Sequence, residues 1–484
     1  MYLGIDLGTS AVKAVVTDDG VVVAEASERL DVSRPGPRMS EQAPEDWWRA
    51  ADAAVRRLKH LAPKVDAIGL SGQMHGAVLL DSGGLVLRNA ILWNDGRSEA
   101  ECAELEGRLD VPGLTGNRAM PGFTAPKLLW VRRHEPAVFA RIKTVLLPKD
   151  YLRYRMTGEL ASDMSDASGT LWLDVGGRRF SKPMLDATGL DESHMPRLVE
   201  GTEVAGVLRR KIADEWGLKP VPVVGGGGDQ AAGAVGAGAV VAGTSFVSLG
   251  TSGVYFVPDS TYRPNPDGGV HAFCHALPGM WHQMSVVLSA ASALTWVTRL
   301  TGAASEAAVV DEVEASGVGP SSVYFLPYLS GERTPHNDPN ALGAFVGLDH
   351  DVDRARLVYA VLEGVAFAVA DGQRVLEEAG ANIGEVTVIG GGSRSTYWGR
   401  ILSAALGRPL TYREDAAVGP ALGAARLAAL GHAGGSPAVV CPQAPVVESV
   451  EASPEAIARS QARFATYRAL YRDLKERFPA LHDA

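Results

Sequence analysis

The chain opens with MYLGIDLGTS (residues 1–10), and the last four letters of that stretch return in FVSLGTSGVYF (residues 246–256). The two LGTS segments begin 242 residues apart, which is half of the 484-residue chain. A four-letter match alone arises about once by chance in a chain of this length, but the flanking apolar positions agree as well: Ile5 with Val247, Val12 with Val254, and Val15 with Val257. Each copy predicts a β-hairpin, with an apolar strand, a Gly-Thr-Ser turn and a second apolar strand. We therefore expect one duplicated hairpin in each half, with two unrelated glycine hairpins as the alternative.

Size and composition favour a globular protein of two domains. A chain of 484 residues exceeds what one hydrophobic core usually serves, and we expect domains over residues 1–240 and 241–484. The formal net charge of −10 argues against nucleic acid or an anionic membrane as the main partner. Three scattered cysteines suit a reducing compartment, and no basic and apolar leader is apparent. We expect a cytoplasmic protein that binds neither nucleic acid nor a membrane.

Three further apolar strands run directly into glycine-rich turns. They are AIGLSGQMHG (67–76), VPVVGGGGDQ (221–230) and VTVIGGGS (386–393). The last two continue into sequence that favours a helix, which is typical of strands in an α/β sheet. Because ligands bind beyond the carboxyl ends of such strands, these turns are candidate binding loops.

Two segments have the spacing of amphipathic helices. Residues 45–61 place Trp48, Ala51, Val55 and Leu58 on one face, which predicts a packing helix. Near the C-terminus, one helical stripe is formed by Phe464, Tyr467, Leu470, Tyr471, Leu474 and Phe478. That stripe predicts a core face, with an interface as the alternative.

The two Gly-Thr-Ser turns predict phosphate binding. Such a turn exposes closely spaced backbone N–H groups and two hydroxyls with no bulky side chain in the way. A pair of them, Gly8-Thr9-Ser10 and Gly250-Thr251-Ser252, would grip a polyphosphate from both sides of a cleft. The first copy is preceded by Asp6 where the second has Ser248. We expect Asp6 to hold Mg²⁺, because a second carboxylate would only repel the phosphates. Lys13 either reaches the phosphates or is an ordinary exposed strand residue.

Asp229 follows four glycines at a predicted helix start. A glycine loop lets the backbone approach a ligand closely, so Asp229 is a candidate base that accepts a hydroxyl proton during phosphoryl transfer. The alternative is that its carboxylate is only the N-cap of the helix. In the first interpretation the two aspartates have separate roles, one holding the metal and one taking the proton.

Over its whole length the sequence resembles the FGGY family of carbohydrate kinases. Five segments carry the resemblance in the family's order: GIDLGTS (4–10), GFTAPKLLW (122–130), SLGTSG (248–253), GAFVGL (343–348) and VIGGGS (388–393). The resemblance implies two actin-like (ribonuclease H-like) α/β domains, with ATP and Mg²⁺ in the cleft between them. It also implies that Asp229 is the base and that Gly391, Gly392 and Ser393 contact the adenosine. Arg356 departs from the signature that begins with GAFVGL (343–348), where a polar or acidic residue is usual.

Within the family, GQMHG (72–76) is similar to the sugar-contacting segment of members that phosphorylate D-xylulose at its O5 hydroxyl. The segments ILWNDGR (91–97) and YLSGERTPH (328–336) also look like those members. The resemblance implies that the sugar is bound by Met74, His75, Trp93, Asp95 and Gln230. Gln230 stands where some relatives have Asn, which affects the contact with one sugar hydroxyl.

Several alternatives stay open from the residues alone. Met74 and Trp93 have core-like side chains, His75 is compatible with a structural role, and Asp95 with capping a turn. The competing functions are a kinase for another polyol, such as ribulose, glycerol or gluconate, and an actin-like or chaperone-like ATPase. A homodimer is in keeping with the resemblance.

Overall fold

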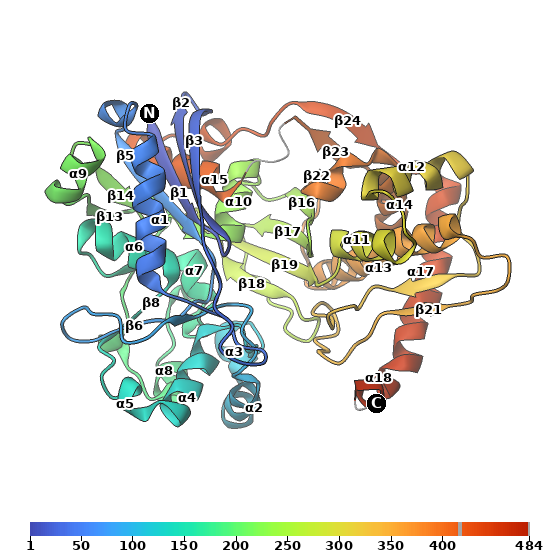
Figure 1. Cartoon of the computed structure of the whole chain (residues 1–484), viewed down its shortest axis with the longest axis horizontal. Helices are drawn as coiled ribbons and strands as arrows, with labels where there is room; N and C mark the ends of the chain where they lie inside the picture. The colour runs from blue at the N-terminus through green and yellow to red at the C-terminus, as the bar shows by residue number, and fades with distance from the viewer. Residues whose placement is uncertain (415–418, 483–484) are drawn as a thin grey trace.

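The computed structural model describes residues 1–414 and 419–482, which form two lobes, each built on a seven-stranded sheet (Figure 1). The first sheet has the order β13-β14-β5-β1-β2-β3, with β15 also paired to β5. Its strands are β1 (Tyr2–Leu7), β2 (Ala11–Asp18), β3 (Val21–Arg29), β5 (Ala67–Gly72), β13 (Val204–Val207), β14 (Pro222–Val224) and β15 (Gly227–Gly228). The second sheet has the order β18-β19-β17-β16-β22-β23-β24. Its strands are β16 (Thr244–Leu249), β17 (Gly253–Asp259), β18 (His271–Cys274), β19 (Trp281–Val287), β22 (Glu385–Ile389), β23 (Leu410–Arg413) and β24 (Val446–Val450).

Both predicted hairpins are confirmed. Strands β1 and β2 pair antiparallel with Asp6 opposite Lys13, and β16 and β17 pair antiparallel with Ser248 opposite Val254. The first strand of each hairpin also has a parallel neighbour, β5 in the first sheet and β22 in the second. The two sheets therefore repeat one local arrangement, and their glycine turns lie at the carboxyl ends of parallel strands.

The outer face of the first sheet packs against α1 (Pro44–Arg57), α6 (Pro148–Thr157) and α9 (Arg210–Trp216). The helix predicted over 45–61 is shorter than expected and ends at Arg57. Its face is also rotated slightly: Trp47 is fully buried, whereas Trp48 is partly buried and stacks on Trp216 at 6.0 Å. The guanidinium of Arg155 lies over the ring of Trp48. This cation–π contact stabilises Trp48 at the partly exposed edge of the core.

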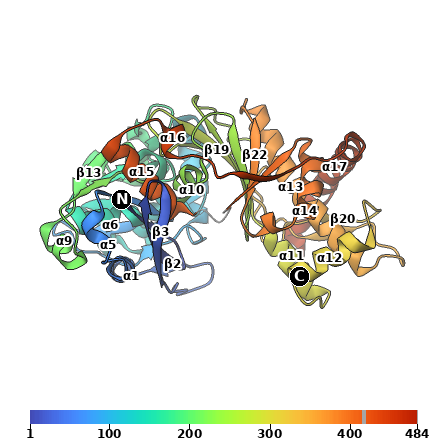
Figure 2. The same cartoon turned by 90° about the horizontal axis from the view of Figure 1, so that it is seen from above.

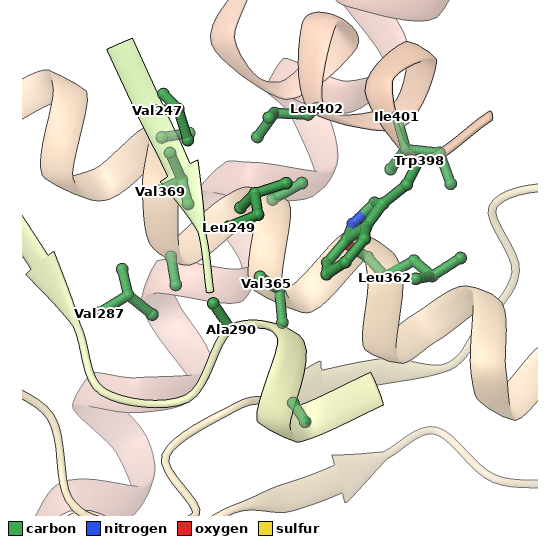
Figure 3. Close-up of a cluster of buried hydrophobic side chains, with 14 of the residues drawn as sticks. Val247, Leu249, Val287, Ala290, Leu362, Val365, Val369, Trp398, Ile401 and Leu402 are labelled. Atoms are coloured by element: carbon green, nitrogen blue, oxygen red, sulfur yellow. The ribbon is translucent and has the colours of Figure 1, made fainter. Parts of the chain in front are cut away.

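The core of the second lobe forms around α13 (Arg354–Glu378), a long and mostly buried helix. Figure 3 shows Val247 and Leu249 of β16 among side chains of α13 and of α14 (Thr396–Leu406). The Trp398 indole donates to the Leu362 carbonyl at 3.0 Å, which fixes α14 against α13. The predicted apolar stripe lies on α17 (Pro454–Leu474) except for Phe478, which begins the separate helix α18 (Phe478–His482). Tyr467 and Tyr471 of the stripe are buried against Tyr328. Within the described part of the chain, no helix combines the length and apolar character needed to cross a membrane.

Two helices join the lobes on the inner face of the first sheet. Helix α10 (Asp229–Ala237) precedes β16, and α15 (Pro420–Ala433) brings the chain back from the second sheet onto the first (Figures 1 and 2). Glycines make this approach possible, because a Cβ on Gly69 would lie 1.8 Å from the Ala424 carbonyl oxygen. The division at residue 240 stays a prediction, and α15 is a segment from beyond it that packs on the first sheet.

Candidate active site

Asp6 lies near the end of β1, beside Ser71 of the parallel strand β5. Its Oδ1 atom is buried and has no hydrogen-bond partner among the residues that the structure describes. Burial raises the pKa of Asp6 to about 6, while the Ser71 hydroxyl and the charge of Lys13 lower it. An unpartnered buried carboxylate oxygen is costly in isolation and is a good ligand for a hard cation.

Asp229 is the first residue of α10 and comes directly after β15. Its N-cap interpretation fails, because Gly228 occupies the N-cap position and no side chain caps the helix. Ser71 of β5 pairs with Asp6 on one side and with Gly227 on the other, so the two aspartates flank the same strand end. Burial first, and then the charge of Asp6, raise the pKa of Asp229 to about 7. The structure thus brings both predicted acids into one electrostatic environment.

A chain of polar side chains holds the first Gly-Thr-Ser turn. The Thr9 hydroxyl donates to Gln73 Oε1 at 3.0 Å and accepts from the Trp93 indole at 3.0 Å. Gln42 Nε2 donates to the Thr9 carbonyl at 2.8 Å, and Gln42 Oε1 accepts from Gln73 Nε2 at 2.9 Å. Trp93 is not a core residue, since 41% of its surface is exposed. Gln42 and Gln73 were not predicted as site residues, although Gln73 lies inside the quoted segment 72–76.

Lys13 is less free than its position suggests. Its ammonium pairs with Glu25 of β3 at 2.6 Å, and 42% of its side chain is exposed. Lys13 lines an interlobe groove of about 910 Å³, together with Ile389 of β22 and Leu422 of α15. The groove therefore borders strand β2, which follows the first phosphate turn, and the strand that leads into the 390–393 loop.

His75 is held in a single orientation by hydrogen bonds to its backbone carbonyl and to its ring. It adopts a left-handed φ of 69°, and its carbonyl accepts from Thr124 Oγ1 at 3.1 Å and from Lys127 Nζ at 2.9 Å. Its Nδ1 donates to the Gly169 carbonyl at 2.8 Å, which leaves Nε2 as the available acceptor. Burial, followed by the charge of Lys127, keeps the pKa of His75 well below its usual range, so the ring is neutral. Strained backbone on a fully supported histidine is typical of a functional site.

Met74 joins the predicted sugar segment to the loop of Asp229. It is buried, and its sulfur would lie 2.9 Å from a Cβ placed on Gly228. A Cβ on Gly169 would lie 2.3 Å from the His75 ring, so both glycines are needed for this contact. Met74 and His75 therefore lie beside the helix start that carries Asp229 and the partly buried Gln230.

The Asp95 carboxylate is already engaged by Ser40, which is distant in sequence, and by Arg97 of its own turn. It accepts from the Ser40 N–H at 2.6 Å and from Arg97 Nε at 2.9 Å, and it forms an ion pair with that guanidinium. Asp95 is buried. These contacts fix the turn that presents Trp93, and direct contact of Asp95 with a sugar stays a prediction.

In the second lobe, the other phosphate turn and the predicted adenosine loop lie together. A Cβ on Gly390 would be 3.0 Å from the carbonyl oxygen of Leu249, directly before Gly250. Gly391, Gly392 and Ser393 form the short 3₁₀ helix η3 (Gly391–Arg394). The Thr251 carbonyl accepts from the Ala290 N–H at 3.0 Å and from Ser292 Oγ at 2.8 Å. The start of α11 (Ala291–Leu300) thus braces the turn and leaves Thr251 and Ser252 exposed.

A buried ionic cluster, which sequence reasoning did not find, supports the Asp229 loop. Lys149 Nζ contacts Asp150 and Asp163 at 2.6 Å and Asp166 at 3.1 Å, and all four side chains are fully buried. Asp163 Oδ2 accepts from the Ser165 hydroxyl, and Ser165 Oγ accepts from the Gly228 N–H at 3.1 Å. Among the described residues these three aspartates are the one group spaced to share a cation, and Lys149 already neutralises them in part. The cluster therefore anchors Gly228, the residue that precedes Asp229, through Ser165.

Comparison with known proteins agrees with this geometry. The N-terminal domain of the FGGY family of carbohydrate kinases matches residues 1–236, and the C-terminal domain of that family matches residues 245–432. The chain is 52% identical to the xylulose kinase of Escherichia coli K12 over 98% of its own length and 99% of the relative's. It is 55% identical to the xylulose kinase of Klebsiella pneumoniae over 88% of its length and 89% of the relative's.

A solved structure from Brucella ovis, described as a "xyloylose kinase", superimposes with a TM-score of 0.94 at 50% identity. The superposition covers 100% of this chain and 99% of the other. The predicted architecture of two actin-like α/β domains is thereby confirmed. The two-lobed fold, the paired glycine turns and the matches over nearly the whole chain lead to one conclusion: this chain belongs to the FGGY family of carbohydrate kinases.

Proposed function

We propose that the protein transfers the γ-phosphoryl group of ATP to the O5 hydroxyl of D-xylulose, giving D-xylulose 5-phosphate and ADP. The observation that carries the proposal is the pair of Asp6 and Asp229, which have raised pKa values and share one strand end. The identity with curated xylulose kinases over nearly the full chain supports the choice of sugar. A sugar kinase of this kind would work in the cytoplasm, and a homodimer is the assembly that we expect.

In the proposed mechanism Asp229 accepts the proton of the sugar hydroxyl. The hydroxyl oxygen forms a bond to the γ-phosphorus, the bond from that phosphorus to the bridging oxygen breaks, and ADP leaves. With a pKa of about 7, Asp229 is ionised in about half of the molecules at neutral pH and is basic enough to take the proton. Asp6 would hold Mg²⁺, which neutralises charge on the transferring phosphates.

The chain's own residues would position the two substrates. Gly8, Thr9, Ser10 and Lys13 would bind phosphate from the first lobe, and Gly250, Thr251 and Ser252 from the second. Gly391, Gly392 and Ser393 would bind the adenosine. Met74 and Trp93 would offer apolar surface to the sugar, while His75, Asp95 and Gln230 would bind its hydroxyls. The neutral His75 ring, with Nε2 free to accept, suits a substrate that consists of hydroxyl groups.

The decisive experiment measures ADP release with ATP and Mg²⁺ in the presence of D-xylulose, D-ribulose, glycerol or gluconate, and without sugar. We expect the highest kcat/KM with D-xylulose. A higher kcat/KM with another polyol would assign that substrate instead, and ADP release that no sugar stimulates would favour an actin-like or chaperone-like ATPase. Light scattering of the purified protein tests the homodimer.

A further inference from the structure

The guanidinium of Arg333 makes no ion pair and no hydrogen bond with any residue that the structure describes. Among the arginines of residues 1–414 and 419–482, it is the one partly or fully buried arginine whose guanidinium has neither an ion pair within 4.0 Å nor a hydrogen bond. Comparable arginines are all engaged; Arg97, for example, pairs with Asp95, and Arg463 pairs with Glu363. Burial lowers the pKa of Arg333, and the charge of the neighbouring Glu332 opposes this shift only in part. An unpaired and desolvated guanidinium is unfavourable unless a ligand completes it.

The backbone of Arg333 is fixed firmly, so this position is not a consequence of a loose loop. Thr334 donates its N–H to the Val286 carbonyl at 3.1 Å, and its hydroxyl accepts from the Val286 N–H at 3.0 Å. One residue earlier, Glu332 Oε1 accepts from the Leu288 N–H at 2.9 Å. The segment is thereby attached to the end of β19. The side chains of Glu332 and Thr334 hydrogen-bond to the backbone beside Arg333, whereas the guanidinium of Arg333 makes no such bond in the described structure.

Arg333 stands next to the histidine side of the proposed sugar site. Its carbonyl oxygen would lie 3.2 Å from a Cβ on Gly269, two residues before His271. The rings of His75 and His271 flank Phe123, with centroid distances of 4.6 and 5.6 Å to that ring. The charge of Arg333 contributes to the lowered pKa of both histidines. By contrast, it is not among the groups that shift the pKa of Asp6 or Asp229.

This placement separates the two ends of the substrate. If the reacting hydroxyl lies at Asp229, the opposite end of a five-carbon chain points toward His75 and Arg333. In an open-chain 2-ketose that end carries the O1 hydroxyl and the O2 carbonyl on adjacent carbons. A guanidinium presents several N–H donors in a planar fork, which matches two neighbouring acceptors. Because the oxygens there are uncharged, an arginine without a carboxylate partner keeps its donors available for them.

We propose that Arg333 is a specificity-determining residue from the second lobe, whose guanidinium donates hydrogen bonds to O1 and to the carbonyl O2 of the ketose. This inference rests on the proposed function and assigns a role to part of the YLSGERTPH segment (328–336). It also means that the sugar is recognised by both lobes: His75 comes from the first and Arg333 from the second. Binding of the ketose would then draw the lobes together around it.

The test is a double-perturbation cycle, in which a change in the enzyme is combined with a change in the sugar and kcat/KM is compared. The wild type and Arg333→Met are assayed with D-xylulose and with 1-deoxy-D-xylulose, which lacks O1. We expect the substitution to lower kcat/KM for D-xylulose by about 100-fold, since the buried sugar oxygens O1 and O2 lose their hydrogen-bond donors. Removing O1 should lower kcat/KM strongly in the wild type and much less in the variant. Arg333→Lys should recover part of the loss, because it restores charge but not the fork.

Matched controls separate recognition from folding. Arg299→Met removes an exposed arginine of α11 in the same lobe and should leave both sugars unaffected. ADP release without sugar, together with the melting temperature, reports on the nucleotide site and the fold. Equal losses for both sugars in Arg333→Met, or no loss for either, would overturn the assignment. If the wild type itself shows no ADP release with D-xylulose, the proposed function fails, and this is known before any variant is made.

Discussion

The charge of Asp6 raises the pKa of Asp229 from the other side of strand β5. Burial first, and then the negative charge of Asp6, make Asp229 ionise less readily. A cation at Asp6 would offset that negative charge. The base and the metal ligand are therefore linked before any substrate binds, and the following predictions start from that link.

Replacing Asp229 with Asn should remove activity and increase stability. Loss of the proton acceptor should lower kcat for the sugar by 10²-fold or more, on the order expected for a general base. The folded pKa of about 7 lies above the ordinary value of 3.8, so the carboxyl's contribution to stability is present at low pH and is lost as the pH rises through 7. At pH 8 the variant should unfold with a free energy higher by on the order of 2 to 4 kcal/mol.

Urea unfolding at pH 5 and pH 8 checks this prediction, because the gain should shrink at the lower pH. Asp473→Asn, which changes an exposed aspartate of α17, should alter neither property. A variant of Asp229 that keeps full turnover would contradict its role as the base. A variant no more stable than the wild type at pH 8 would contradict the raised pKa.

Replacing Asp6 with Asn should lower the pKa of Asp229. The charge that opposes ionisation of Asp229 disappears, while its burial remains. A titration of ¹³C-labelled aspartate carboxyls by NMR, in the absence of metal, would follow this midpoint directly. An unchanged midpoint would show that the two carboxylates are independent. The same variant should lose the dependence of turnover on Mg²⁺ concentration.

Replacing Ser165 with Ala should slow the reaction without weakening nucleotide binding. The Gly228 N–H loses its acceptor, so the residue before Asp229 is no longer anchored to the ionic cluster. We expect a fall in kcat of about 10-fold, an unchanged KM for ATP, and a loss of about 1 to 3 kcal/mol of stability. Ser162→Ala is the matched control, since the Ser162 hydroxyl is buried with no partner in the described structure. Similar effects of both variants would mean that packing alone matters here.

Replacing Gly69 with Ala should separate α15 from the first sheet. A methyl group at residue 69 would overlap the Ala424 carbonyl oxygen, because the Cβ would lie 1.8 Å from it. We expect a loss of at least about 3 kcal/mol in the free energy of unfolding. Gly107→Ala is the control: that glycine lies in α2 (Glu99–Arg108) with open space around it, and alanine there should be neutral or favourable. Differential scanning calorimetry compares the two.

Trp93 should report sugar binding by its fluorescence. Its indole is 41% exposed and donates to Thr9 Oγ1, so a ligand beside it would change both its solvation and this hydrogen bond. We expect a saturable change in emission with D-xylulose, which disappears in Trp93→Phe. Trp48→Phe, on the far side of the first sheet, should leave the change intact. A change that survives in Trp93→Phe would place the sugar elsewhere.

The hairpins were predictable because their pattern is local. Apolar alternation and a Gly-Thr-Ser turn are properties of ten consecutive residues, and the structure confirms them at both copies. The pairing of Asp6 with Asp229 was predictable only as a consequence of strand ends that meet at one sheet edge.

The supports of the site were not predictable, because they depend on contacts between segments far apart in the chain. Lys149 contacts three aspartates that come from different elements, and Gln42 of strand β4 (Glu41–Gln42) donates to the Thr9 carbonyl. The ion pair of Asp95 with Arg97 was not predicted either, and contact of Asp95 with the sugar stays a prediction.

The position of α15 has a consequence for how the polypeptide is made. Ribosomes deliver the N-terminal residues first, yet Gly4 and Gly69 meet their partners only on α15 (Pro420–Ala433). The part of the inner surface that α15 covers therefore stays exposed until almost the entire chain has been synthesised. The first lobe therefore cannot complete its packing during synthesis. Termination before residue 420 would leave exposed apolar surface on its sheet, and such a fragment would be prone to aggregate.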